Sequence, residues 1–340
     1  MSNLIPHLPA LQVVIPLFAA PLCLLAGRTG LAWIIALAAS SAATATAMAL
    51  AYLTYHDGTI SYHMGGWAPP WGIEYVVDTA NAFILLLVSS IATMVLIYSP
   101  ASVAKEIRPG RGHLYYCMYI LCLTGLLGIA ITGDAFNVFV FLEVSSLSSY
   151  ALIAMGGQRK ALTAAFQYLV MGTIGATFFL IGVGLLYMMT GTLNMADLAK
   201  RIPEIQDSRP VLAAFAFITV GLALKAALFP LHLWLPNAYA YAPSGVSAFM
   251  AATATKVSLY VLLRFTFTIF GAEFAFGNLP LSWVLLVPAV IAMFAGSFSA
   301  MFQRDIKRML AYSSVAQIGY ITLAISLGTN AGVMAALVHI

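Results

Sequence analysis

Charged residues are scarce in this sequence. Only 8% of its 340 residues are Asp, Glu, Lys or Arg, whereas hydrophobic residues make up 62%. A soluble domain carries roughly 25% charged residues, so this chain cannot cover a water-exposed surface, which excludes an ordinary soluble protein. The net charge of +4 is too small to indicate nucleic-acid binding. We expect an all-α protein that crosses the membrane many times as one helical bundle.

Cysteine and cofactor motifs are also scarce. The three cysteines, Cys23, Cys117 and Cys122, are odd in number and lie inside apolar segments, so they indicate packing residues rather than a disulfide framework or a metal site. The sequence contains no P-loop, no dinucleotide fingerprint and no clustered Cys/His spacing. We expect this chain to bind no cofactor and no metal. The first apolar segment lacks the basic start and cleavage site of a signal peptide, so we expect it to remain as a span.

Long apolar runs are abundant. A helix needs about 20 apolar residues to cross a bilayer, and ten runs come close to or exceed that length. They cover residues 4–26, 31–54, 76–98, 114–132, 135–155, 162–189, 211–229, 245–271, 281–301 and 309–328. An eleventh run begins near Gly332 and is still apolar at Ile340, so we expect the chain to stop inside its eleventh span.

Lysine and arginine lie in alternate loops. They occur at residue 28 and at 105–111, 159–160 and 304–308, whereas the opposite loops, 56–75, 133–134 and 272–280, contain acidic residues but no lysine or arginine. Because cytoplasmic loops carry the excess of Lys and Arg, we expect the N-terminus on the non-cytoplasmic side of the cell inner membrane. Segment 194–210 mixes both charges with apolar residues at helical spacing, which predicts a short amphipathic surface helix.

Four charged residues remain inside the predicted spans: Glu143, Lys225, Lys256 and Arg264. A charge at the centre of a spanning helix costs about 3 kcal/mol on insertion scales, so such residues usually face a polar cavity or a partner and mark a path for ions or protons. The alternative is a structural ion pair that ties helices together. Arg264 lies near the end of its run, and for this residue alone we favour a side chain that reaches the membrane interface.

The stretch GLALKAALFPLHLWLPNAY places Pro230 five residues after Lys225. A proline inside a helix clashes with the carbonyl four residues earlier, here that of Ala226, so we expect the helix to break immediately after Lys225 and to stay irregular to about Pro236. Broken helices at membrane depth line hydrated cavities. His232 lies in this stretch and is either a proton relay, because an unperturbed histidine titrates near neutrality, or a structural cap for the freed carbonyls.

Lys256 lies in a span rich in small residues, which allow close helix approach and leave room for water. Tyr260 and Arg264 follow at steps of four, on the same face of the predicted helix. That face is a candidate wall for a proton path.

A buried lysine loses proton affinity through desolvation and regains it beside a carboxylate. Movement of Glu143 relative to Lys225 would therefore switch this lysine between holding and releasing a proton, which Lys256 could accept. The serines at 145, 146, 148 and 149 could supply hydroxyls that bond across helices or order water.

Several stretches resemble the antiporter-like proton-translocating subunits of Mrp-type cation/proton antiporters, respiratory complex I and membrane-bound hydrogenases. They are FNVFVFLEVSSLSSYALIAMGG, TGTLNMADLA, LALKAALFPLHLWLPNAYAYAPSGVSAFMAATATKVSLYVLLR and QRDIKRMLAYSSVAQIGYI. The resemblance covers most of the chain from about residue 134. It implies that Glu143 matches the glutamate of the fifth helix, Lys225 the lysine of the broken seventh helix and Lys256 the lysine of the eighth, with His232 between the two lysines.

The resemblance also implies about fourteen helices with two inverted five-helix repeats. Residues 1–133 would then hold helices 1–4, residues 134–271 the core of the first repeat, and residues 281–340 the start of the second. His339 is similar to the first histidine of the eleventh helix, so we expect the second broken helix to lie outside this sequence.

Three functions are compatible with the resemblance. The first is that of a D-type Mrp protein, the proton-conducting subunit of a multi-subunit Na⁺/H⁺ antiporter, whose partners would be other membrane subunits, protons and Na⁺. The alternative is a proton-pumping subunit, without redox centres of its own, of NADH-quinone oxidoreductase or a membrane-bound hydrogenase. A third is a proton-driven module that energises uptake of a solute such as inorganic carbon.

Overall fold

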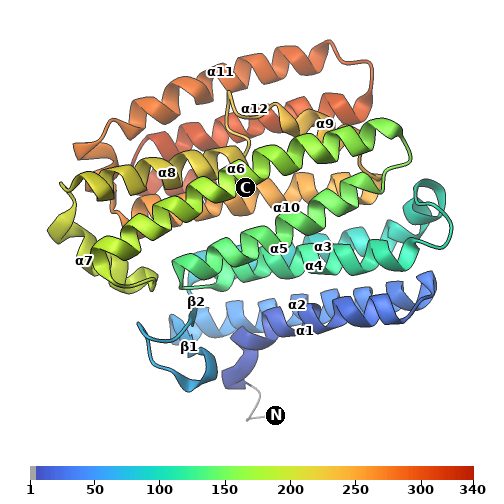
Figure 1. Cartoon of the computed structure of the whole chain (residues 1–340), viewed down its shortest axis with the longest axis horizontal. Helices are drawn as coiled ribbons and strands as arrows, with labels where there is room; N and C mark the ends of the chain where they lie inside the picture. The colour runs from blue at the N-terminus through green and yellow to red at the C-terminus, as the bar shows by residue number, and fades with distance from the viewer. Residues whose placement is uncertain (1–4) are drawn as a thin grey trace. The chain divides into compact units, whose positions relative to one another are not determined.

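The fold is almost entirely helical, as the apolar runs predict. In the computed structural model, which describes residues 5–340, nine helices are long and apolar enough to cross a membrane. The long helices are α1 (Leu8–Leu25), α2 (Thr29–Asp57), α3 (Thr79–Glu106), α4 (Gly112–Ile131), α5 (Ala135–Ala154), α6 (Arg159–Thr190), α10 (Ser244–Leu263), α11 (Leu281–Met301) and α12 (Ile306–Ser326) (Figure 1). The shorter helices are α7 (Met195–Ile205), α8 (Arg209–Lys225), α9 (Trp234–Tyr241) and α13 (Asn330–His339). Short 3-10 segments are η1 (Ile5–His7) and η2 (Met64–Gly66), and π-helical segments are η3 (Arg264–Ile269) and η4 (Glu273–Asn278).

Two predicted spans differ from the helices observed. The run at 211–229 predicts a full crossing, but α8 has 17 residues and ends at Lys225, so residues 5–340 contain nine long spanning helices rather than ten. The third helix begins later than its apolar run, because residues 76–77 belong to a strand. Asp78 caps α3 by accepting a hydrogen bond from the Asn81 backbone at 3.0 Å.

A two-stranded antiparallel hairpin, which the sequence did not predict, fills the loop between α2 and α3. Strand β1 (Ile60–His63) pairs with β2 (Glu74–Val77), with Ile60 opposite Val77. The loop between α4 and α5 meets this hairpin: Tyr75 forms a bridge with Thr132, and the Gly133 N–H donates to the Glu74 carbonyl at 2.8 Å. The hairpin is therefore fixed to the ends of two spanning helices.

The chain divides into two compact units. The first comprises Met1–Leu169 with Tyr241–Thr253, and the second comprises Val170–Ala240 with Ala254–Ile340. Helices α6 and α10 each contribute residues to both units.

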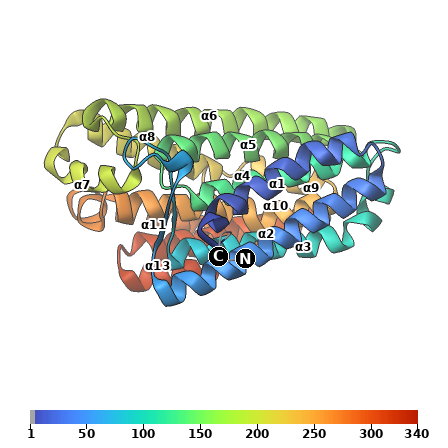
Figure 2. The same ribbon diagram turned by 90° about the horizontal axis from the view of Figure 1, so that it is seen from below.

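In the first unit, α1, α2 and α3 pack in sequence along the chain (Figure 2), and α4 contacts α1, α2, α3 and α5. Glycines on α4 allow α5 to approach closely. A Cβ on Gly125 would lie 2.5 Å from the Ser145 backbone nitrogen, and one on Gly128 would lie 2.4 Å from the Phe141 ring. The three cysteines are buried and unbridged in this unit, which confirms them as packing residues.

In the second unit, α11 and α12 lie side by side (Figure 1). Glycines set this contact too. A Cβ on Gly296 would lie 2.9 Å from the Ala316 backbone nitrogen, and one on Gly319 would lie 2.8 Å from the Ala289 carbonyl oxygen. Small residues thus produce close helix contacts in both units, as is typical of membrane helices.

The amphipathic helix predicted at 194–210 is observed as α7. Leu198 and Ile202 are fully buried, so the apolar side of α7 packs on protein. On its polar side, Arg201 forms an ion pair with Asp197 at 3.0 Å and donates to the Thr190 carbonyl. The hydrogen bond from Arg201 holds the pKa of Asp197 below its ordinary value.

Candidate functional site

Helix α8 ends at Lys225, where the sequence predicts the break. The Ala227 N–H donates to the Leu224 carbonyl at 3.2 Å, and the Leu228 N–H donates to the Ala223 carbonyl at 2.9 Å. These two bonds form a Schellman motif, in which one left-handed residue lets the chain satisfy the last helix carbonyls. Ala227 is that residue, with a φ of +56°.

The break is therefore a capped helix end, followed by a short irregular stretch. Pro230 lies three residues after Ala227 and prevents the helix from resuming there. The irregular stretch is shorter than predicted, because α9 begins at Trp234 and Pro236 lies in its first turn. A helix tolerates proline in its first turn, where the N–H groups have no intrahelical acceptor. Residues 226–233 thus separate α8 from α9.

Lys225 is 4% exposed, so its side chain does not face lipid. Its Cγ lies 3.5 Å from the position of a Cβ on Gly175 of α6. Gly221, one turn earlier in α8, faces the same helix, because its Cβ would lie 2.6 Å from the Gly175 carbonyl oxygen. Lys225 therefore lies at the α6–α8 contact. It also lies in the last turn of α8, where the negative end of the helix dipole favours a cation.

Sequence reasoning assigned no role to Trp234, which bridges the break. Its indole N–H donates to the Leu224 carbonyl of α8 at 3.1 Å. A buried tryptophan usually finds a hydrogen-bond acceptor, and the open end of a broken helix provides one. The presence of a tryptophan within the predicted break could have indicated such a hydrogen bond.

His232 occupies the break as predicted, and its backbone and ring both have contacts there. Its carbonyl accepts the Leu235 N–H at 3.0 Å, and its ring stacks on Phe229 with centroids 5.1 Å apart. The side-chain hydrogen bond to the freed Leu224 carbonyl comes from Trp234 rather than from His232. A proton-relay role for His232 stays a prediction.

Lys256 is half-buried on α10, which continues directly into η3. One turn beyond Lys256, the Tyr260 hydroxyl accepts a hydrogen bond from Arg264 Nε at 2.9 Å, and the Arg264 guanidinium lies 5.6 Å from the Tyr260 ring centre. The pair confirms that Tyr260 and Arg264 share a helix face. Arg264 lies five residues before the end of the span at Ile269, and an interfacial position for its side chain stays a prediction.

Glu143 lies on α5 and is half-buried rather than fully buried. Its neighbours along the same face, Val140 and Leu147, are 38% and 57% exposed. Gly125 packs on the other side of α5, against Ser145. Glu143 therefore points away from the contact between α4 and α5.

The serines that follow Glu143 bond mainly to their own helix. The hydroxyls of Ser145, Ser148 and Ser149 each donate to a carbonyl about one turn earlier, at 2.7 to 3.0 Å. Ser149 also lies 3.2 Å from the Cys122 sulfur of α4. The contact with Cys122 agrees with the expectation that these serines bond across helices, and the ordering of water by their hydroxyls stays a prediction.

The four predicted site residues are divided between the units. Lys225, His232 and Lys256 belong to the second unit, on α8, the break and α10, and Glu143 belongs to the first. The arrangement in the second unit provides a buried amine at an opened helix end, which is suited to holding and releasing a proton. Control of Lys225 by Glu143 stays a prediction.

The chain is similar to several known membrane proteins. The family model for NADH:quinone oxidoreductase/Mrp antiporter transmembrane proteins matches residues 132–340. The chain is 46% identical over 337 residues to the N-type subunit of NADH-quinone oxidoreductase from Desulforudis audaxviator, an alignment that covers 98% of this chain and 66% of the relative. It is 33% identical over 292 residues to the D-type subunit of the Na(+)/H(+) antiporter from Alkalihalophilus pseudofirmus, covering 86% of this chain and 58% of the relative. The chain thus spans less than two thirds of the length of these curated relatives.

The chain is also similar to membrane subunits in solved structures. A chain of the membrane-bound sulfane sulfur reductase, an archaeal respiratory membrane complex, matches with a TM-score of 0.89 and 33% identity, covering 98% of this chain and 68% of that one. A chain of the Mrp complex from Dietzia sp. DQ12-45-1b matches with a TM-score of 0.87 and 29% identity, covering 99% and 62%. The capped break, both lysines and Glu143 all fall within the matched family region. This chain belongs to the NADH:quinone oxidoreductase/Mrp antiporter transmembrane family.

Proposed function

We propose that this chain is a proton-conducting subunit of a multi-subunit Na⁺/H⁺ antiporter and works with other membrane subunits. The observation that carries the proposal is Lys225, an amine 4% exposed at the end of an interrupted helix. The proton affinity of an amine in a low-dielectric site responds strongly to nearby charges, so small changes around Lys225 could make it take up or release a proton. The relation to the D-type antiporter protein and the likeness to the Mrp complex support Na⁺ exchange and a multi-subunit assembly.

In this proposal Glu143, Lys225, His232 and Lys256 form the proton relay. Approach of the Glu143 carboxylate strengthens proton binding by Lys225, and its retreat releases the proton. His232 or water then passes the proton to Lys256. All four residues lie within 134–271, which we propose as the core of the first repeat, between helices of residues 1–133 and the start of a second repeat at 281–340.

The 46% identity to the N-type oxidoreductase protein favours a second candidate function. As a proton-pumping subunit of NADH-quinone oxidoreductase, the chain would use the same relay and carry no redox centre of its own. The two functions differ in what is coupled to proton movement through the relay: exchange with Na⁺ in the first, and quinone reduction by a partner protein in the second.

Inverted membrane vesicles that contain this chain and its partner subunits separate the two functions. An acid-inside gradient is set up by an independent pump, and Na⁺ is then added outside. Antiport predicts that Na⁺ dissipates the gradient, and that vesicles lacking the chain show no such effect. A gradient that is insensitive to Na⁺ but is formed by NADH oxidation, only when the chain is present, would contradict the antiporter proposal and support the second function.

We also propose an orientation, with the N-terminus on the non-cytoplasmic side of the cell inner membrane. The basis is the alternation of basic loops, because Lys and Arg are retained on the cytoplasmic side. Lys105, Arg108 and Arg111 then face the cytoplasm, whereas the β1–β2 hairpin faces the opposite side.

A further inference from the structure

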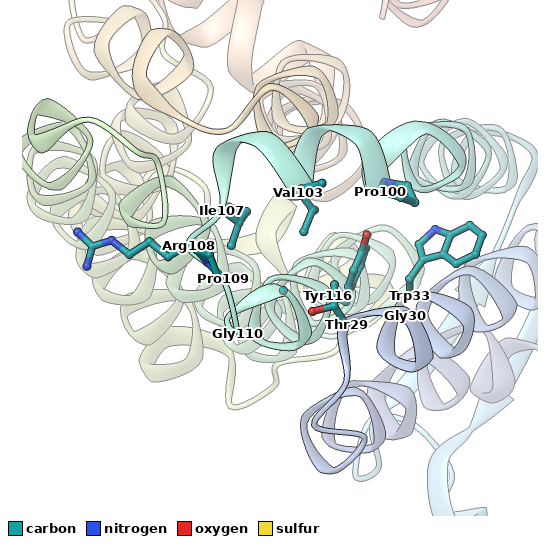
Figure 3. A pocket seen from close by; sticks show the side chains of 12 residues that line it. Thr29, Gly30, Trp33, Pro100, Val103, Ile107, Arg108, Pro109, Gly110 and Tyr116 are labelled. Carbon is teal, nitrogen blue, oxygen red and sulfur yellow. The ribbon is translucent and has the colours of Figure 1, made fainter.

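A cavity of about 410 Å³ lies in the first unit, at the end of the bundle that carries the basic loops (Figure 3). The last turns of α3 supply one wall through Pro100 and Val103, and Ile107, the residue that follows α3, extends it. The start of α2 supplies another wall through Thr29 and Trp33. Among the described residues, those that line the cavity include no carboxylate. The proton relay uses none of these residues.

The N-termini of two helices meet at this cavity. Arg28 precedes α2 and Arg111 precedes α4, and neither side chain caps its helix. Thr29 lies against Gly112, because a Cβ on Gly112 would be 2.3 Å from the Thr29 side chain. Two sets of N–H groups without intrahelical acceptors, and two positive dipole ends, are thus held together.

A positive charge lies just outside the mouth of the cavity. Arg108 lines the cavity and is exposed, and its guanidinium extends outward, away from Trp33 and Tyr116 (Figure 3), so the charge lies beyond the end of the cavity opposite Trp33. The acidic residue nearest in sequence, Glu106, is engaged elsewhere: its carboxylate accepts the Ser244 N–H at 2.9 Å and the Ser102 hydroxyl at 2.8 Å.

The inner end of the cavity is apolar, because the polar atoms of its two aromatic residues already have partners. The Trp33 indole N–H donates to the Leu96 carbonyl at 2.9 Å, and the Tyr116 hydroxyl lies 3.3 Å from that of Ser99. Val103, which is buried, adds aliphatic surface. The cavity therefore has a cationic mouth and an apolar interior.

We propose that this cavity binds an anionic phospholipid. Its phosphate lies at the mouth, near Arg108 and the two helix N-termini, and part of an acyl chain lies between Trp33 and Val103. The charge at the mouth complements a lipid phosphate, and basic pockets between spanning helices are known sites for anionic headgroups. A free phosphate would leave the apolar interior unfilled, and a neutral lipid would leave the positive charge unpaired.

Native mass spectrometry of the whole chain tests this proposal, with phosphatidylglycerol and phosphatidylcholine as probes at equal mole fraction. We expect one phosphatidylglycerol to be retained in preference to phosphatidylcholine. Arg108→Gln should weaken retention about fivefold, the effect of one basic residue near an anionic membrane surface. Arg304→Gln, an exposed charge on another loop, is the control and should have no effect.

A second pair of variants tests the cavity itself. A Cβ on Gly30 would meet no atom within 4 Å, and Gly30 lines the cavity, so Gly30→Leu should fill it and abolish retention of the lipid. Gly184→Leu is the matched control, because Gly184 is also helical and has equally open space. Equal retention of both lipids, unchanged retention in Gly30→Leu, or displacement of the lipid by millimolar inorganic phosphate would each overturn the proposal.

Discussion

At the scale of single residues, the way in which helix α8 ends after Lys225 depends on Ala227. Ala227 takes a left-handed conformation, with φ of +56°, which glycine adopts far more readily. Because alanine gives no sequence signal for such a turn, the Schellman motif could not be predicted. The break itself was predictable from Pro230 and from the cost of burying Lys225, and the structure confirms both its place and the burial of the lysine.

Substitution of Ala227 should change stability according to the strain at this residue. Ala227→Gly should leave the free energy of unfolding within about 1 kcal/mol of wild type, because relief of left-handed strain offsets the entropy gained by the unfolded chain. Ala227→Val should lower it by about 2 kcal/mol, because a β-branched residue is a poor fit at positive φ. Thermal unfolding in detergent measures both effects, with Ala223→Val, one turn earlier in α8, as the control. Unchanged stability of Ala227→Val would contradict the strain argument.

At the scale of elements, apolar runs predicted most helices but not what joins them. The hairpin β1–β2 was missed because its strands have four residues each, too short for a clear alternating pattern. The end of α3 was placed too early, since the helix runs past Pro100 to Glu106. Gly221 and Lys225 are four residues apart on one face of α8, which suggests a close helix contact there. The sequence does not show that Gly175 of α6 is the residue on the other side of this contact.

The contact between α6 and α8 should be sensitive to any side chain at Gly221. Gly221→Val places atoms within 2.6 Å of the Gly175 carbonyl and should lower the free energy of unfolding by about 2 kcal/mol through overpacking. The same change at Gly184, whose Cβ would meet nothing within 4 Å, should cause no loss of stability, because valine has a higher helix propensity than glycine. Comparison of the two melting temperatures measures the effect. Equal losses would show that the close approach of α6 and α8 is not required.

At the scale of the whole molecule, amino-acid composition was enough to predict a membrane protein. Four sequence stretches were enough to predict its family. The proposed control of Lys225 by Glu143 stays a prediction, because it depends on how helices distant in sequence are placed. Glu143 also proved half-buried beside exposed Val140 and Leu147, whereas its surrounding apolar run suggested full burial. Exposed apolar residues around a charge are as expected for a surface covered by lipid or by another subunit.

The proposed orientation predicts which loops a membrane-impermeant maleimide can reach in intact cells. Asp57→Cys, at the exposed end of α2, should be labelled from outside, and Arg304→Cys, in a basic loop, should be labelled only after lysis. The native cysteines are buried and should give a low background. The reverse pattern would contradict the orientation.

The most direct test of the central claim is the rate of proton transport by the assembled complex in sealed vesicles, measured for Lys225→Ala. The account predicts a rate lower by about 100-fold, the usual effect of removing a proton-transferring group, with assembly intact. Glu143→Ala should lose transport in the same way, and Lys200→Ala, an exposed lysine on α7, should transport at the wild-type rate. Near-wild-type transport by Lys225→Ala would contradict the account.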